Sequence, residues 1–433
     1  MMKFLRISGQ DKLKLPYNLR SNQQEIIDTI EKGLHSKNHI VIEAPTGSGK
    51  TFTSLASSLP FVINKSYKII YCVRTNSQQE QVIRELKAFK ESGNNFSVVA
   101  IQGRQSMCPQ QKDDDELAKS NWSEKSKICK SLKLQSKLGE AGCPYYRKLL
   151  RPTKSLIDRW SSEIYSAEEF TVNAESENLC PYELNKLLLK KAQIVIVPYV
   201  YFFEDFIRKY LLGWMDTTID KIITIVDEAH NLPDWSREAA SESLSVDSLH
   251  RASQESDKFG LLLGDGSPPT LFLDLVESAL KSLGEYHISE GDDEGLLPSH
   301  IVSLDSEVPT FETEMMSLGK MTLSRLKQQS SDLSKMGQQI RQTLLEKGKR
   351  PRSYLGSVGD FLCRWLDSIE SHTIRLVGSK PLRLEKVCLD PRVMTSFLDE
   401  TAGVVMMSGT LSPLGMFLSL IHISEPTRLL SIA

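Results

Sequence analysis

"APTGSGKT", residues 44 to 51, follows the apolar run "HIVIE" and precedes a helical pattern. The apolar run is rich in β-branched residues and predicts a buried strand. A strand, a glycine-rich turn and a helix in this order form the context that a phosphate-binding loop requires. Gly47 and Gly49 allow a tight turn whose N–H groups point at phosphate oxygens. The stretch therefore predicts an α/β fold that binds a nucleotide at the end of a strand.

The side chains of this loop suit a triphosphate and Mg²⁺. Lys50 is expected to reach the β and γ phosphates, and the Thr51 hydroxyl is expected to ligate Mg²⁺. The alternative is a glycine-rich turn that binds nothing, and the flanking strand and helix make it the weaker interpretation. The other cofactor-binding positions expected in the loop are Thr46, Gly47, Ser48 and Gly49.

A second apolar run ends in acidic residues at "IVDEAH", residues 225 to 230. Asp227 is expected to bind Mg²⁺ directly or through water, and Glu228 is placed to orient and deprotonate an attacking water. An acidic pair after a strand can also be a surface loop, but the phosphate loop in the same chain favours catalysis. His230 either couples the nucleotide state to neighbouring elements or caps the turn, and the sequence leaves both open.

Alternating strands and helices continue on both sides of the loop. An amphipathic helix is predicted at "SQQEQVIRELKAFK", and further strands at "YKIIYCVRT", "AQIVIVPY", "IITIVD" and "GVVMMSGT". This alternation predicts a parallel sheet with helices on its faces. It breaks between residues 104 and 180, and residues 240 to 375 are predicted to be mostly helical. The length of 433 residues favours two or more domains.

The composition excludes few functions. Hydrophobic residues make up 40% and charged residues 25%, as in ordinary globular proteins. The net charge of −2 gives no sign of nucleic acid, but a basic groove can be local. We expect no membrane partner, because the first residues lack a signal-peptide core and no run reaches about 18 apolar residues. The expected location is the cytoplasm, or the nucleus for a eukaryotic source.

Four of the seven cysteines lie within 73 residues. They are Cys108, Cys129, Cys143 and Cys180. They are 21, 14 and 37 positions apart, so none forms the short CxxC pairs typical of zinc sites. The sequence leaves three alternatives open, a [4Fe–4S] cluster, a zinc ion or unligated thiols, and the proline after three of the cysteines favours the first. The other three, Cys72, Cys363 and Cys388, are expected in the core.

Taken in order, these motifs resemble the XPD/DinG group of superfamily 2 helicases, and its archaeal XPD-like members in particular. The resemblance covers residues 13 to 417 and rests on "APTGSGKT", the four cysteines, "DEAH" and "MSGTLSP". "LRSNQQEII" matches the upstream element of the family, which implies Arg20 and Gln23 as an adenine-recognising pair. "VRTNSQQ" matches the motif that grips a single strand, which implies that Arg74 and Thr75 contact it.

The resemblance implies a RecA-like motor domain that is interrupted by two insertions. It implies that the four cysteines hold a [4Fe–4S] cluster. It also implies an ATP-dependent DNA helicase that uses ATP and Mg²⁺, moves 5′ to 3′ on single-stranded and forked DNA, and acts as a monomer with DNA repair proteins. The implied segments are the motor domain at 1–103, 181–240 and 376–417, the iron–sulfur insertion at 104–180 and the helical arch at 241–375.

The resemblance stops soon after "SGTLSP". The family continues into a second RecA-like domain that supplies an arginine to the ATP site, and no "Q-x-x-GR-x-x-R" pattern follows here. Residues 418–433 depart from the family and are expected to be a non-native tail. We therefore expect a chain that holds a cluster and binds ATP weakly but does not unwind DNA. The alternatives are a non-catalytic iron–sulfur DNA-binding module and a DNA- or RNA-stimulated translocase.

Binding of a single strand needs cations and stacking aromatic side chains. "YYRKLLRPTK" mixes both, and its candidates are Tyr145, Tyr146, Arg147, Lys148, Arg151 and Lys154. The alternative is a solvated basic helix with a buried tyrosine, and the sequence leaves the two nearly balanced. A second aromatic group is expected to pack as core rather than to stack on bases, and it contains Tyr199, Tyr201, Phe202 and Phe203.

Overall fold

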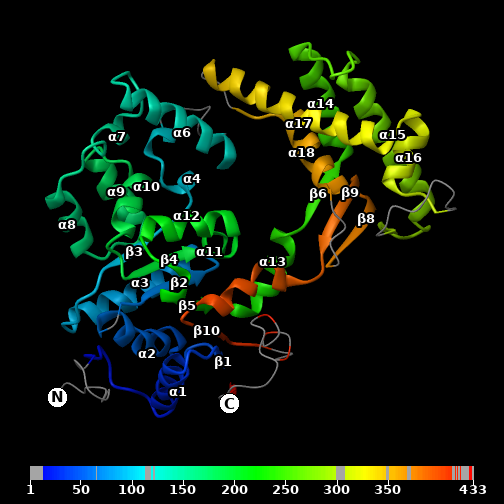
Figure 1. Cartoon of the computed structure of the whole chain (residues 1–433). Helices are drawn as coiled ribbons and strands as arrows, with labels where there is room; N and C mark the ends of the chain where they lie inside the picture. Colours follow the sequence, from blue (N-terminus) through cyan, green and yellow to red (C-terminus); the bar gives the residue numbers. More distant parts are fainter. Residues whose placement is uncertain are drawn as a thin grey trace. The chain divides into compact units, whose positions relative to one another are not determined.

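The computed structural model of this chain describes residues 13–64, 66–112, 119, 122–298, 308–347, 351–367, 372–411, 415, 417, 420 and 429–431. They form two compact units (Figure 1). Unit 1 contains Met1–Ala118, Cys129–Ser236 and Arg392–Ala433, and unit 2 contains Lys119–Ile128 and Arg237–Pro391. No helix in the described ranges is long and apolar enough to cross a membrane.

Within the described residues, unit 1 is built on a parallel sheet of seven strands. The strand order is β11-β1-β10-β5-β2-β4-β3, and each neighbouring pair is parallel. The strands are β1 Ile40–Glu43, β2 Lys68–Val73, β3 Val98–Ala100, β4 Ile194–Pro198, β5 Ile222–Asp227, β10 Gly403–Ser408 and β11 Leu429–Ser431. The predicted α/β fold with a parallel sheet is therefore confirmed.

Helices pack against both faces of this sheet (Figure 1). Along β2, Ile69 and Tyr71 belong to one apolar core and Ile70 and Cys72 to another, because successive side chains of a strand point to opposite faces. The first core includes α1 Gln23–His35, α2 Lys50–Asn64 and α3 Asn76–Glu91. The second includes α10 Pro181–Leu189, α11 Tyr199–Phe203, α12 Asp205–Met215 and the start of α13 Leu232–Ala239.

Short helices between β3 and β4 carry the cysteines. They are α4 Arg104–Met107, η1 Pro109–Lys112, α6 Trp122–Lys137, α7 Pro144–Arg147, α8 Lys154–Ser162 and α9 Ala167–Ser176. Cys108, Cys143 and Cys180 stand directly before η1, α7 and α10, each of which opens with proline. Proline suits a first helical position because its φ fits and its missing N–H would have no helical partner. Cys129 lies within α6 instead.

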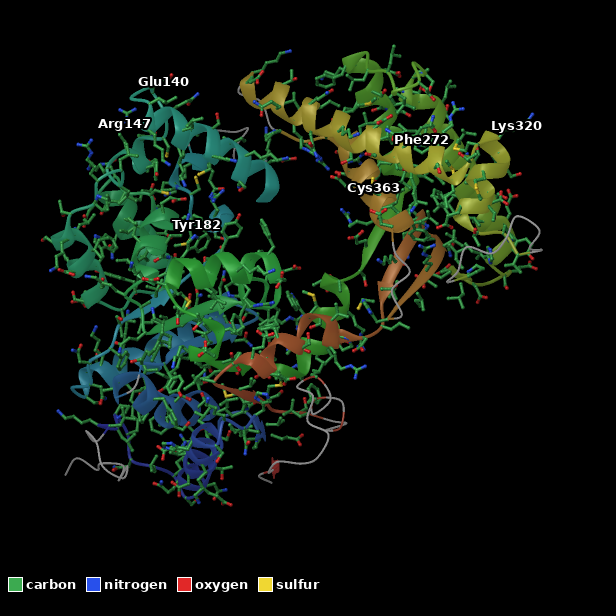
Figure 2. The ribbon with its side chains drawn as sticks, in the orientation of Figure 1. Glu140, Arg147, Tyr182, Phe272, Lys320 and Cys363 are labelled. Atoms are coloured by element: carbon green, nitrogen blue, oxygen red, sulfur yellow. The ribbon has the colours of Figure 1, made fainter. Side chains whose placement is uncertain are left out.

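Unit 2 combines helices with an antiparallel sheet of order β6-β9-β8-β7 in the described residues. Its strands are β6 Glu242–Ser245, β7 Glu294–Leu297, β8 Thr373–Ser379 and β9 Leu382–Cys388. Its helices are α14 Val246–Phe259, α15 Pro269–His287, α16 Phe311–Gly319, α17 Leu323–Glu346 and α18 Tyr354–Asp367. A core of its own, which includes Trp365, Leu384 and Phe272, joins helices and sheet; Phe272 is labelled in Figure 2.

This sheet is the main difference between unit 2 and its sequence prediction. Residues 241–375 are predicted to be mostly helical, yet they contain β6, β7 and the start of β8. β6 and β7 have four residues each, too few to show a clear alternation, and β7 overlaps an acidic, glycine-containing stretch that predicts a loop. Because β8 and β9 pair with these strands, residues 376–391 lie in unit 2 rather than with the motor segments.

The remaining elements are short. They are the 3₁₀ turns η2 Ile219–Lys221, η3 Ala229–Asn231, η4 Pro391–Met394 and η5 Ser396–Glu400. Of the three cysteines expected in the core, Cys72 and Cys388 are buried and Cys363 is only half-buried. In the expected tail 418–433, residues 429–431 form the edge strand β11 beside β1, and most other positions lie outside the described residues.

Candidate nucleotide site and cysteine cluster

The carboxyl ends of β1, β10 and β5 lie side by side at one edge of the sheet. Glu43 pairs with Ser408, and Met407 pairs with Asp227. A pocket of about 560 Å³ lies beside them, within the range of ordinary ligand sites. The predicted residues that line it are Arg20, Gln23, Thr46, Gly47, Gly49, Lys50, Thr51, Asp227 and Glu228. Ser48 belongs to the same loop but is not part of the lining.

Two glycines give the phosphate loop its shape. Gly47 and Gly49 have φ angles of +84° and +86°, in the left-handed region that other residues rarely adopt. A Cβ on Gly49 would lie 2.4 Å from Gln23 Nε2, whereas a Cβ on Gly47 would meet no described atom within 4 Å. The open side of Gly47 therefore leaves room for a phosphate at the amino end of α2, where backbone N–H groups and the helix dipole favour anions.

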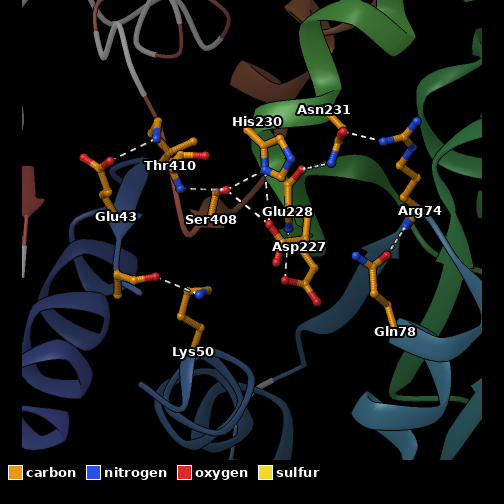
Figure 3. Close-up of polar contacts among 12 residues, drawn as sticks. Glu43, Lys50, Arg74, Gln78, Asp227, Glu228, His230, Asn231, Ser408 and Thr410 are labelled. Carbon is orange, nitrogen blue, oxygen red and sulfur yellow. Dashed lines mark hydrogen bonds and ion pairs between the residues drawn. The ribbon is translucent and has the colours of Figure 1, made fainter. Parts of the chain in front are cut away.

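The loop lysine contacts the loop itself. Lys50 Nζ donates to the Ala44 carbonyl at 2.7 Å and to the Pro45 carbonyl at 3.2 Å (Figure 3). These are neutral acceptors, so a phosphate oxygen that enters the pocket would replace them with a stronger, charged one. Thr51 follows at the start of α2, 7% exposed, with its side chain in the pocket lining.

Arg20 and Gln23 brace the phosphate loop from α1 and the residues before it. Arg20 Nη1 donates to the Gly47 carbonyl at 2.8 Å, and Gln23 Nε2 donates to the Ser48 carbonyl at 3.0 Å. Beside them, the ring of Tyr17 lies 5.6 Å from that of Phe52, and both line the pocket. Sequence reasoning missed this aromatic pair, although Tyr17, three positions before Arg20, is a residue type that can stack on a base.

The two acidic residues at the end of β5 differ in their exposure to solvent. Asp227 is 8% exposed, and burial together with the neighbouring Glu228 carboxylate raises its pKa to about 6. Glu228 has a φ of +47°, a left-handed conformation that is unusual for a residue with a side chain. Its N–H donates to Asp227 Oδ1 at 3.0 Å. The turn thus keeps Asp227 within the fold while the more exposed Glu228 also lines the pocket.

A hydrogen-bonded chain connects this pair to β10 (Figure 3). Ser408 Oγ donates to Glu228 Oε2 at 3.2 Å and lies 2.6 Å from His230 Nδ1. His230 Nδ1 also lies 3.1 Å from Glu228 Oε2. His230 therefore contacts a neighbouring strand end and not only its own turn. Ser408 was not among the predicted site residues, because its place beside β5 depends on a pairing that one sequence does not reveal.

Arg74 and Thr75 lie at the end of β2. The Arg74 guanidinium donates to Asn231 Oδ1, and Asn231 Nδ2 donates to the Glu228 carbonyl at 3.2 Å (Figure 3). Thr75 begins α3, where its hydroxyl accepts from the Gln78 N–H at 3.3 Å in a capping box. Asn231, which sequence reasoning missed, thus connects the acidic pair to Arg74, for which the resemblance implies a contact with single-stranded DNA.

The fold brings the four cysteines of the insertion near one another. Cys143 and Cys180 are buried, and Cys108 and Cys129 are half-buried. Cys129 lies near Cys108, and Cys180 lies near Cys129 and Cys143. Among the described residues, however, no three His, Cys, Asp or Glu side chains have the spacing of a metal site. Four cysteine sulfurs are the ligand type that a four-thiolate centre requires. The cluster stays a prediction.

Two cations and one carboxylate lie near these cysteines, and of these only the cations favour thiolates. Arg104 interacts with Cys129 and Cys180, and its Cζ lies 4.7 Å from the ring centre of Tyr182. Lys133, one helical turn after Cys129, contacts the buried Glu183 at 2.8 Å. Sequence reasoning missed Arg104, Lys133 and Glu183, although a cation four residues before the first cysteine and another four after the second were visible.

The residues that are candidates for binding single-stranded DNA separate into two groups. Tyr145 and Tyr146 are half-buried, whereas the four basic side chains are exposed, namely Arg147, Lys148, Arg151 and Lys154. The second aromatic group is buried as expected, in Tyr199, Tyr201, Phe202 and Phe203. Within it, the Tyr199 hydroxyl donates to the Asp227 carbonyl at 2.5 Å, which fixes the end of β5 from the opposite core.

Two family models match this chain. The DEAD_2 family matches residues 71–249, and the helical and beta-bridge domain matches residues 268–432. The first match includes the four cysteines and the acidic pair. The second includes most of unit 2 and the last strands of unit 1.

Several proteins of known identity are similar to the chain. The helicase subunit XPD/RAD3 of general transcription and DNA repair factor IIH from Saccharomyces cerevisiae is 26% identical over 255 residues, 55% of this chain and 32% of that protein. The ATP-dependent DNA helicase XPD from Sulfolobus acidocaldarius is 26% identical over 239 residues, 55% of this chain and 37% of that protein. A solved XPD helicase structure matches with a TM-score of 0.59 and 22% identity over 94% of this chain and 61% of its own.

The two family models and the similar proteins together place this chain among the superfamily 2 helicases, and its parallel sheet, phosphate loop and acidic strand end agree with that class. Within that class it belongs to the XPD-like group, on which both family models and the similar proteins agree. The matched region spans about a third of the length of the two curated relatives, 32% and 37%.

Proposed function

We propose that this chain is the ATP-binding motor part of an ATP-dependent DNA helicase that acts in DNA repair. The observation that carries the proposal is one pocket that joins Lys50 and Thr51 of the phosphate loop to Asp227 and Glu228. The names of the two XPD relatives, a DNA repair factor subunit and an ATP-dependent DNA helicase, support the same activity.

In the proposed reaction, water attacks the γ phosphorus of ATP, the bond to the bridging oxygen breaks, and ADP and phosphate leave. Glu228 orients the water and takes its proton, and Lys50 leaves the loop carbonyls to hold the β and γ phosphates. Backbone N–H groups around Gly47 and Gly49 bind the phosphate oxygens. Mg²⁺, held by Thr51 and Asp227, would neutralise the phosphate charge.

We propose that the isolated chain binds ATP but hydrolyses it slowly. Among the described residues, Arg20 is the only arginine in the pocket lining, and its guanidinium already contacts the Gly47 carbonyl. No described arginine therefore faces the leaving phosphate, and related enzymes lose roughly 10³ to 10⁵ in rate without one. A purified chain with strong DNA-stimulated ATPase activity would contradict this part of the proposal.

We propose that the four cysteines hold a [4Fe–4S] cluster next to a single-stranded or forked DNA substrate. The gathering of the thiols and the nearby Arg104 and Lys133 support it, and movement 5′ to 3′ rests on the resemblance alone. Anaerobic purification is expected to give a broad visible absorption and about four irons per chain, both lost on treatment with an iron chelator. One zinc per chain, or no metal, would contradict the cluster.

The test of the proposed function is ATP binding by Lys50→Ala. Calorimetric titration with ATP and Mg²⁺ is expected to show binding by the wild type and a loss of at least about tenfold in affinity for the variant, since a charged hydrogen bond to phosphate is worth roughly 1.5–3 kcal/mol. Lys327→Ala, an exposed lysine on α17, is the matched control and is expected to bind like the wild type.

The outcomes separate the rival functions. A chain that binds single-stranded DNA through its cysteine segment, with no effect of Lys50→Ala on ATP, would be a non-catalytic binding module. Stronger stimulation of ATPase activity by RNA than by DNA would favour an RNA-directed translocase on the same motor.

A further inference from the structure

Tyr71, in the middle of β2, buries a polar group that the reaction outlined above does not use. Its side chain is 0% exposed, and its hydroxyl has no hydrogen bond of good geometry to any described residue. A buried donor that is left unsatisfied destabilises a fold. A phenylalanine would fill the same space without that cost, so the hydroxyl requires an explanation.

The strand register shows where this hydroxyl lies. β2 runs parallel to β5, and Tyr71 pairs with Ile225, two residues before Asp227. Tyr71 and Ile225 belong to the same core, and side chains two positions apart share a face, so Asp227 lies on this face as well. The same face is covered by α2, which begins with the phosphate loop lysine and Thr51.

The polar side chains near the Tyr71 hydroxyl are Thr51 and Asp227, which form the proposed magnesium site, and the neighbouring Ser54. Ser54 Oγ already donates to the Thr51 carbonyl at 3.0 Å, and Asp227 Oδ1 already accepts from the Glu228 N–H at 3.0 Å. A phenol keeps its proton at neutral pH, so the Tyr71 hydroxyl is a hydrogen-bond donor. A carboxylate has lone pairs for several donors, so Asp227 can accept from it.

We propose that Tyr71 is a positioning residue for the magnesium site, whose hydroxyl donates to the Asp227 carboxylate when Mg²⁺–ATP is bound. This inference rests on the proposed function. Side chains that hydrogen-bond a metal ligand fix its orientation, and their loss typically lowers metal affinity about 10- to 100-fold. Tyr71 touches neither the nucleotide nor the metal, and it acts through Asp227 only.

The variant that tests this is Tyr71→Phe, which removes one oxygen and keeps the ring. Thr224→Val is a matched control, because Thr224 also lies in the sheet, is 0% exposed and has a hydroxyl without a described partner. Thr224 pairs with Ile70, on the face of the sheet opposite to Tyr71 and Asp227. Removal of a buried unsatisfied hydroxyl costs no hydrogen bond, so both variants are expected to unfold at or above the wild-type temperature.

The measurement is calorimetric titration of the full chain with ATP, first in EDTA and then at a series of Mg²⁺ concentrations. In EDTA, Tyr71→Phe is expected to bind ATP like the wild type. Mg²⁺ is expected to raise the affinity of the chain for ATP. The Mg²⁺ concentration at which half of this increase is reached is expected to be about tenfold or more higher in Tyr71→Phe than in the wild type, and unchanged in Thr224→Val. A merely structural role would shift the unfolding temperature and leave this Mg²⁺ dependence as it is.

The outcomes distinguish this inference from the proposed function. A wild-type chain that binds no ATP would overturn both. A wild-type chain that binds ATP in a Mg²⁺-dependent way, with the same dependence in Tyr71→Phe, would overturn the role of Tyr71 and leave the nucleotide site intact. An equal shift in Tyr71→Phe and Thr224→Val would also overturn it, since Thr224 lies outside the site.

Discussion

Some carboxyl side chains in this protein lie in surroundings that disfavour their ionised form. Asp227 is one example, and Glu31 on α1 is another outside the candidate site. Burial and the neighbouring Asp28 raise the pKa of Glu31 to about 7, and its Oε1 is buried without a described hydrogen-bond partner. Unlike Asp227, Glu31 does not line the nucleotide pocket, so its ionisation bears on stability alone.

Glu31→Gln is therefore expected to raise the unfolding temperature at pH 8 and to lose this advantage near pH 5. The pKa of about 7 in the folded chain lies above the ordinary 4.5, so the folded state binds the proton more tightly and wild-type stability falls as the pH rises between these values. Above this range the wild type carries a partly buried charge that the amide lacks. Thermal unfolding at both pH values measures the difference.

The control for Glu31 is Glu80→Gln, an exposed carboxyl on α3. It is expected to change the unfolding temperature little at either pH, as exposed substitutions usually do. A gain from Glu31→Gln that is equal at pH 5 and pH 8 would show that the amide acts through packing and not through charge.

At the scale of elements, one ion pair connects two helices that carry cysteines. Lys133 of α6 contacts Glu183 of α10 at 2.8 Å, with side chains 20% and 10% exposed. Cys129 lies one turn before Lys133, and Cys180 lies directly before α10. The pair therefore holds two of the four candidate ligands at a fixed separation.

Glu183→Gln is expected to speed the loss of iron from an anaerobically purified chain by about tenfold, because residues that orient metal ligands carry effects of roughly that size. The rate of bleaching by a chelator measures this without any assay of activity. Glu177→Gln breaks an exposed pair with Arg159 in the same segment and is expected to have no effect. Equal rates in the two variants would argue against a role for the pair.

Sequence predicted the elements of unit 1 better than those of unit 2 for a physical reason. Buried parallel strands are nearly continuous apolar runs, and "KIIYCV" and "IITIVD" stand out against their neighbours. β3, with three residues, and β6 and β7, with four each, are too short for such a signal. β6 and β7 are held by β9 and β8, which lie far away in the chain.

The residues of the candidate site likewise include some that the sequence predicts and some that it does not. Lys50, Thr51, Asp227 and Glu228 could be predicted because each belongs to a contiguous motif next to a strand. Ser408 and Tyr71 come near the end of β5 only through strand pairing. These contacts depend on register, which one sequence does not fix.

On the scale of the whole molecule, the two units have separate apolar cores. Unit 2 also contains a buried ion pair, in which Arg375 of β8 contacts Glu312 of α16 at 2.8 Å with side chains 7% and 1% exposed. Arg375 further donates to the Trp365 carbonyl at 2.6 Å. Domains with their own cores unfold as separate cooperative units.

Glu312→Met is therefore expected to lower one calorimetric transition and leave the other in place. Loss of one partner leaves a buried charge and costs about 3–5 kcal/mol, or roughly 10 °C for a unit of this size. Mg²⁺–ATP is expected to raise only the transition that Glu312→Met does not move, since the nucleotide pocket lies in unit 1.

Two further variants serve as controls for Glu312. Glu242→Gln breaks an exposed pair with Arg364 in unit 2 and is expected to shift the transition by less than about 1 kcal/mol. The double variant Glu312→Met with Arg375→Met is expected to recover much of the loss, because it removes the unpaired charge. Movement of both transitions by Glu312→Met would show that the chain unfolds as one unit.

The position of β10 in the sheet determines when this protein can fold during its synthesis. β10 lies between β1 and β5, and Val405 pairs with Ile40 across more than 360 positions of the chain. A ribosome that adds about 5–20 residues per second needs roughly 20 to 70 seconds to travel that far. Until β10 is made, β1 and, once it has been synthesised, β5 expose strand edges that are open to wrong partners. The nascent chain thus has a long period of vulnerability to aggregation, because unit 2 is itself complete only at Pro391, shortly before β10.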